Sequence, residues 1–192
     1  MAALGGCFFL IVALAFFAAI WAIWRYNNLV LLKNQVVNAW KQIDVQLKRR
    51  HDLIPNLIAS VKGEMQFEQD TLEKVIRARN TAVSAQGVAD TADKENALTQ
   101  TLSRLFALAE NYPNLKANES VRALMEELSS TENKIGFARQ FYNDLATRFN
   151  TAQQVFPDSF IAQTFKFQPV ELYEIREATE REVPKVDLNV RS

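Results

Sequence analysis

The spacing of apolar residues divides the chain into a continuous apolar start and a longer amphipathic remainder. Ala2 to Trp24 contains no charged residue. As a helix this stretch would be about 34 Å long at roughly 1.5 Å per residue, enough to cross a hydrocarbon core of about 30 Å. The residues expected at the membrane interface close the run: Trp21, Trp24, Arg25 and Tyr26. Residues 1–25 are therefore predicted to be a transmembrane anchor.

Two other interpretations of this segment fit less well. A cleaved signal peptide would begin with basic residues and have a shorter apolar run. Leu4-Gly5-Gly6-Cys7 resembles a lipoprotein processing site, but too few residues precede Cys7 to form an apolar segment upstream. A retained anchor is the favoured interpretation.

Basic residues on one side of the anchor predict its orientation. No Lys or Arg precedes the span. Six basic residues follow it and only one acidic residue, Asp44, lies among them: Arg25, Lys33, Lys41, Lys48, Arg49 and Arg50. Because basic flanks stay in the cytoplasm, the N-terminus is expected outside and the C-terminal domain in the cytoplasm of a bacterial inner membrane.

Helical periodicity after residue 25 predicts an all-α protein, in which the membrane helix continues into an antiparallel four-helix bundle. The bundle covers residues 26–156, with helices at about 26–50, 53–85, 94–111 and 119–156. Asp52 is a good helix cap and Pro55 is tolerated in a first turn. A turn is therefore expected at Arg50–Asp52, and a loop at about Gly87–Asp93.

The last of these helices has the clearest pattern in the chain. Its inward positions alternate spacings of three and four residues, which is typical of a bundle or coiled-coil seam. They are Val121, Leu124, Leu128, Thr131, Ile135, Ala138, Tyr142, Leu145, Phe149, Ala152 and Phe156.

Residues 157–192 are expected to form an irregular or extended tail. Its candidate contacts with the bundle or a neighbouring subunit are Phe160, Phe165, Phe167, Val186 and Leu188. The alternation of Val186, Leu188 and Val190 after Pro184 suits a strand-like end, and disorder is an equal alternative.

Composition argues against an enzyme and against a cofactor. The chain has one histidine, His51, and one cysteine, Cys7. A di-iron bundle needs two Glu-x-x-His motifs, and Lys48 stands three residues before His51. Lys and Arg total 22, as do Asp and Glu, so a nucleic-acid partner is not expected.

One cluster is a candidate for partner binding or assembly: Arg49, Arg50, His51, Asp52, Pro55 and Asn56. The alternative is a solvated turn, with basic residues placed favourably at a helix C-terminus.

Two sequence stretches resemble the LemA family of bacterial membrane-anchored proteins. The first includes Asn38-Ala39-Trp40 and Arg49-Arg50-His51-Asp52-Leu53-Ile54-Pro55-Asn56-Leu57, and the second includes Tyr142-Asn143, Phe149-Asn150 and Val183-Pro184-Lys185-Val186. The resemblance implies one membrane helix, a helical domain and no established catalytic activity. It also implies relatives connected with membrane remodelling around magnetic organelles or encoded near membrane proteases.

Two functional hypotheses follow. The first is a non-enzymatic scaffold that self-assembles into a homo-oligomer on the lipid bilayer and organises or remodels the membrane. Its motivation is the long seam, the aromatic tail and the small membrane residues Ala15, Ala18, Ala19 and Ala22. The second is an adaptor that docks a membrane protease or signalling protein through residues 48–57.

Overall fold

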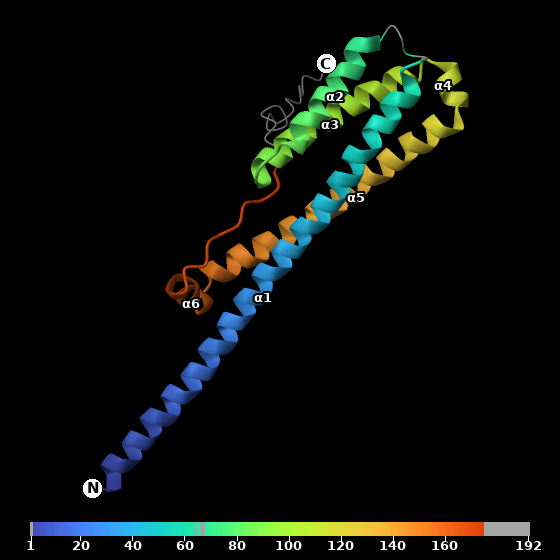
Figure 1. Ribbon diagram of the computed structural model, residues 1–192. Coiled ribbons are helices and arrows are strands. Elements are labelled where there is room, and N and C mark those ends of the chain that lie inside the picture. Colours follow the sequence, from blue (N-terminus) through green and yellow to red (C-terminus); the bar gives the residue numbers. More distant parts are fainter. Residues whose placement is uncertain (1, 64, 66–67, 175–192) are drawn as a thin grey trace, which may run out of the picture.

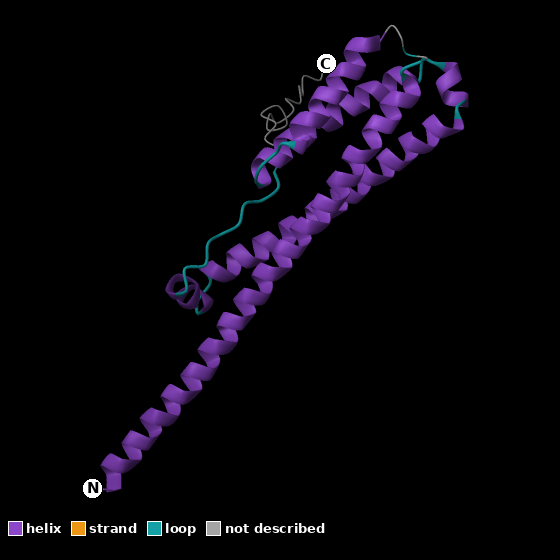
Figure 2. Ribbon diagram, in the orientation of Figure 1, coloured by secondary structure: helices purple, strands orange, loops and turns teal. Residues whose placement is uncertain are grey.

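The computed structural model describes residues 2–63, 65 and 68–174, with side chains from Phe9 onward. Within this part of the chain the ordered elements are helices joined by turns and one extended segment, and no strand is formed (Figure 2). The predicted all-α class is therefore confirmed.

The first helix, α1 (Ala2–Val61), carries both the membrane anchor and one side of the domain. Its N-terminal part projects alone from the rest of the molecule (Figure 1). This part is long and apolar enough to cross a membrane, and none of its most apolar stretch is buried within the protein. The anchor continues without a break into the domain, as the sequence predicts.

Helix α5 (Glu119–Gln154) packs along α1 in the opposite direction. The Trp40 and Tyr142 rings lie 5.5 Å apart at the middle of the pair, and Arg49 on α1 meets Glu127 near the start of α5 at 2.5 Å. The predicted seam is largely confirmed, because the following members are buried: Val121, Leu128, Thr131, Ile135, Tyr142, Leu145 and Phe149. Thr131, the polar member, donates its hydroxyl proton to the Glu127 carbonyl at 2.8 Å.

Helices α2 (Gln69–Val83) and α3 (Val88–Ala109) form a shorter pair beside the far half of α1 and α5 (Figure 1). The short α4 (Pro113–Ala117) then leads into α5. The core of this far half joins all these helices, with Ile54 and Leu57 from α1, Val75 from α2 and Leu98 from α3 among its buried members. Of α1, α2, α3 and α5, the pair α1 and α5 reaches toward the anchor, so these four helices are unequal in extent (Figure 1).

The expected turn at Arg50–Asp52 is wrong, because α1 continues through Pro55 to Val61. Proline lacks an N–H, so the His51 carbonyl four residues earlier has no helical donor. Arg79 of α2 fills that gap, donating from Nε to the His51 carbonyl at 3.1 Å. The helix predicted at 53–85 is consequently divided between α1 and α2.

Two other boundaries differ from the prediction. Helix α3 begins at Val88, inside the stretch predicted as a loop, and Gly87 precedes it at a φ of 79° that favours glycine. Helix α5 ends at Gln154, where Val155 turns extended. Phe156, predicted as the last seam residue, is therefore 82% exposed.

Candidate interaction site

The candidate cluster at residues 49–56 lies on a continuous helix, and its central arginine faces inward. Arg50 is 1% exposed. Its guanidinium donates to the Glu132 carboxylate, to Thr99 Oγ1 at 2.8 Å and to the Glu95 carbonyl at 3.2 Å. Arg50 thus joins α1 to α3 and α5 inside the domain.

His51 belongs to the same buried network. Its Nε2 lies 2.6 Å from Oε1 of Glu95, a side chain that is itself buried. Thr99 in turn donates to Glu132 Oε1 at 3.3 Å. Sequence reasoning missed Glu95, Thr99 and Glu132. The burial of Glu95 could have been predicted from its position, because Glu95 lies three residues before Leu98 and therefore on the apolar face of α3.

The rest of the cluster is on the surface of α1. Asp52, Pro55 and Asn56 are exposed, and Arg49 is about half exposed in its ion pair with Glu127. The structure therefore separates the predicted site into an internal pair and a polar helix surface.

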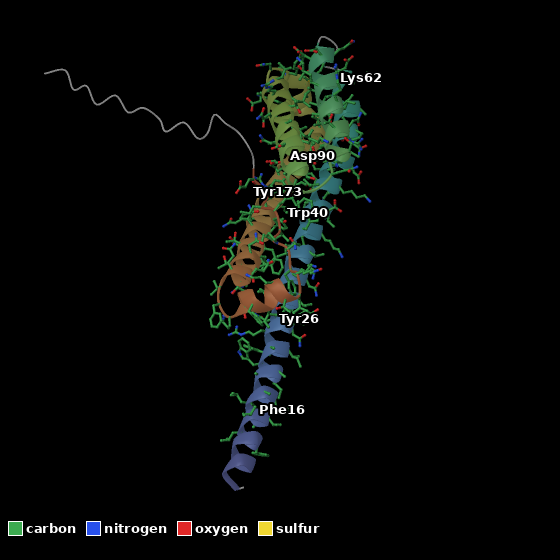
Figure 3. All side chains as sticks on the ribbon, turned by 90° about the vertical axis from the view of Figure 1, so that its left-hand side faces the viewer. Phe16, Tyr26, Trp40, Lys62, Asp90 and Tyr173 are labelled. Carbon is green, nitrogen blue, oxygen red and sulfur yellow. The ribbon has the colours of Figure 1, made fainter. Side chains whose placement is uncertain are left out.

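The predicted membrane-interface residues lie where the domain ends and α1 emerges (Figure 3 labels Tyr26). The Arg25 guanidinium lies over the Trp24 ring at 4.9 Å and the Trp21 ring at 5.7 Å. Its Nε is 3.3 Å from Oδ1 of Asp158, the first residue of α6 (Asp158–Thr164). This end of the domain is thereby fixed to the last turn of the apolar run.

Two of the candidate tail phenylalanines contact the domain. Phe165 and Phe167 approach the Tyr26 ring at 4.7 and 5.8 Å, and Phe167 also meets Phe149 at 6.2 Å. Phe160 is exposed. Val186 and Leu188 lie outside the described residues.

The chain then returns along α5 as an extended segment, residues 167–174 (Figure 2). Asn150 binds both backbone groups of Val170, accepting from its N–H at 2.9 Å and donating to its carbonyl at 2.8 Å. Asn143 binds Tyr173 in the same way, at 2.8 and 3.1 Å. Since these asparagines are two helical turns apart, they replace the neighbouring strand that extended backbone usually requires.

Tyr173 closes this segment beside Trp40, as the labelled side chains in Figure 3 show. Burial raises the pKa of Tyr173 to about 12, against the opposing effect of Arg139, whose guanidinium lies over its ring at 4.7 Å. Burial also raises the pKa of Tyr142, whose hydroxyl donates to the Glu171 carbonyl at 2.7 Å.

Several large apolar side chains outside the membrane helix are uncovered, and one group of them lines a concave surface. It is a groove of about 550 Å³ between α1 and α5, called here the α1–α5 groove. Its lining is Lys41, Gln42, Val45, Gln46, Lys134, Phe137, Ala138 and Phe141. Phe137 is 74% exposed, and Val45 and Phe141 are also exposed. Large exposed apolar side chains gathered in one place are typical of an interaction surface.

Among the described residues, no three His, Cys, Asp or Glu side chains are grouped so that they would hold a metal ion.

The fold and these surfaces define a membrane-anchored helical protein with one N-terminal apolar helix. The sequence model of the LemA family matches residues 39–188, and the chain belongs to that family.

Three individual relatives are similar to most of this chain. The chain is 27% identical to protein LemA of Metamycoplasma hominis over 86% of this chain and 74% of that protein. It is 22% identical to magnetosome protein MamQ of Magnetospirillum gryphiswaldense over 78% of this chain, and it covers 64% of that relative, less than two thirds of its length. Magnetosome protein MamQ 2 of Paramagnetospirillum magneticum is 21% identical over 80% of this chain.

Proposed function

We propose that this protein is a non-enzymatic scaffold that assembles with copies of itself on the membrane and organises the bilayer beneath the assembly. The observation that carries the proposal is the α1–α5 groove, where Phe137, Phe141 and Val45 are exposed to water. The proposed location is a bacterial inner membrane with the helical domain in the cytoplasm, on the distribution of basic residues.

The position of the groove favours a second copy as its occupant. Lys41 lies seventeen residues beyond Trp24, which places the groove about 25 Å along the helix axis from the end of the apolar run. A second copy anchored in the same membrane holds its own groove at the same height. Anchoring therefore restricts both surfaces to one layer, which raises their effective concentration.

The packing of the domain around the α1–α5 pair also suits a scaffold. Its long antiparallel packing, the buried Arg50 network and the bound segment at Val170 and Tyr173 tie the described domain together. Such a domain presents its outer surface in one fixed shape, and preorganised surfaces associate with a smaller entropic cost.

The test compares the mass of the full-length protein with that of a Phe137→Ser/Phe141→Ser variant, by light scattering in mild detergent. We expect an oligomer for the natural sequence and a smaller species for the variant. The matched control is Ile76→Ser/Val83→Ser, which removes exposed apolar side chains from α2 and should leave the mass unchanged. Equal masses for all three proteins would contradict the role of the groove.

A further inference from the structure

The α5–α6 corner of the domain carries a second group of exposed apolar side chains, separate from the α1–α5 groove. Phe156 and Phe160 are 82% and 68% exposed, and Val155 and Phe165 are each more than half exposed. These four residues lie within one short stretch that includes α6, and this stretch is called here the α6 corner.

The opposite side of α6 fixes its height on the membrane helix. Ile161 and Ala162 are buried against Leu29, with Ala22 and Tyr26 packed beside them. Ala22 belongs to the uncharged run that ends at Trp24, so α6 overlaps the last turn of that run. The ion pair between Arg25 and Asp158 holds the first residue of α6 at the same level.

The height of this contact matches the headgroup layer of a bilayer. Residues 22–29 of a helix cover about 10 Å. The hydrocarbon core is about 30 Å thick and the whole bilayer about 40–45 Å, which leaves roughly 5–8 Å of polar layer on each side. With Trp21 and Trp24 at the boundary, α6 lies beside the polar layer and the outermost acyl chains.

We infer that the α6 corner is a second membrane contact, in which Phe156 and Phe160 enter the lipid interface next to the transmembrane helix. Phenylalanine on a short interfacial segment is the side chain that such partial burial stabilises. Gln163, Thr164 and Lys166 are exposed in the same segment and provide the polar and basic groups that lipid headgroups bind. The occupant is the bilayer because the surface is continuous with the anchor.

A second contact has a mechanical consequence. A single helix leaves a domain free to tilt about the point where it leaves the membrane. Contact through α6 would brace the domain on one side and set the direction in which α1 and α5 rise from the bilayer.

The test places a nitroxide label at residue 160 of the full-length protein, through Phe160→Cys in a Cys7→Ser background, reconstituted into phosphatidylcholine–phosphatidylglycerol bilayers. Val83→Cys is the matched control, because Val83 is a 54% exposed apolar residue of α2 that lies outside the α1–α5 groove. Collisions with oxygen, which concentrates in lipid, are compared with collisions with a water-soluble nickel chelate. We expect the oxygen-to-nickel ratio at residue 160 to exceed that at residue 83 several-fold.

Two results would overturn the inference. In the first, residue 160 meets the nickel chelate as freely as an exposed site in water. In the second, residue 160 is shielded from both reagents, which would mean that protein covers the α6 corner. Phe156→Cys provides an independent second position, and circular dichroism verifies that each labelled protein keeps its helices. Neither position contributes to the groove, so loss of assembly and loss of lipid contact are distinguishable.

Discussion

Replacing Arg50 by alanine removes a buried cation that bonds to two other helices. Its guanidinium contacts Glu132, Thr99 and the Glu95 carbonyl, and the Glu95 carboxylate lies 3.7 Å from its Nη2. Glu132 is partly exposed and can turn to water, but Glu95 is 3% exposed and would keep His51 as its nearby partner.

Breaking a buried ion pair by removing one partner costs about 3–5 kcal/mol, because the other charge is left uncompensated. Since His51 remains beside Glu95, the lower end, about 3 kcal/mol, is expected. A domain of this size loses roughly 2–4 °C of melting temperature per kcal/mol, so Arg50→Ala should melt about 6–12 °C lower.

The assay is thermal unfolding of the full-length protein in detergent, followed by circular dichroism of the helices. Arg49→Ala is the matched control, because Arg49 is the neighbouring residue and pairs with Glu127 at a half-exposed site. Such pairs contribute about 1 kcal/mol or less. Equal melting temperatures for the two variants would refute the argument that Arg50 ties the three helices together.

Three further predictions concern the described domain. The pKa of Tyr173 is raised to about 12, whereas a tyrosine in the unfolded chain titrates near 10, so the unfolded chain loses its proton first as the pH rises. The free energy of unfolding should therefore fall by about 2–3 kcal/mol between pH 10 and 12. Tyr173→Phe should weaken this loss when unfolding is measured across that pH range. Asn150→Ala removes both hydrogen bonds to Val170, which together contribute about 2 kcal/mol to the binding of the extended segment. Proteolysis and amide exchange at residues 167–174 should therefore become faster. Unchanged rates would exclude the proposal that Asn150 holds this segment on α5. Arg79→Met should lower the free energy of unfolding by about 1–3 kcal/mol, because the His51 carbonyl loses its donor. The same substitution should lower it less in a Pro55→Ala background, where the N–H of residue 55 can donate to the His51 carbonyl. Equal losses in the two backgrounds of this double-mutant cycle would contradict the proposed role of Arg79.

The parts of the fold that sequence predicts are those set by local periodicity. The three- and four-residue spacing on α5 identifies the buried positions from Val121 to Phe149, because each turn of a helix returns its side chains to the same face. The uncharged run before Arg25 likewise identifies the membrane helix from its length and composition.

The errors arise where a distant residue changes the local preference. Asp52 and Pro55 predict the start of a helix. The helix instead continues through them, and Arg79 of α2 donates the hydrogen bond that the His51 carbonyl would otherwise lack. The sequence alone suggests a partner-binding cluster or a solvated turn at Arg50 and His51, whereas the groups that bury them lie on α3 and α5. Such tertiary pairings leave no periodic signal at the cluster itself.

The candidate surfaces were predicted in part. Phe165 and Phe167 contact the domain, as expected of the aromatic tail. Phe137 and Phe141 were not singled out, because they flank the α5 seam by one position and only the finished packing reveals that α1 leaves them uncovered.

The proposed scaffold function depends on the assembly of several copies of this protein on the membrane. The most direct test extracts the full-length protein with its surrounding lipid into polymer-bounded discs and measures the protein mass of single particles. We expect one predominant species at a multiple of the mass of one chain. Discs that contain a single chain, at protein densities where copies share a membrane, would contradict it.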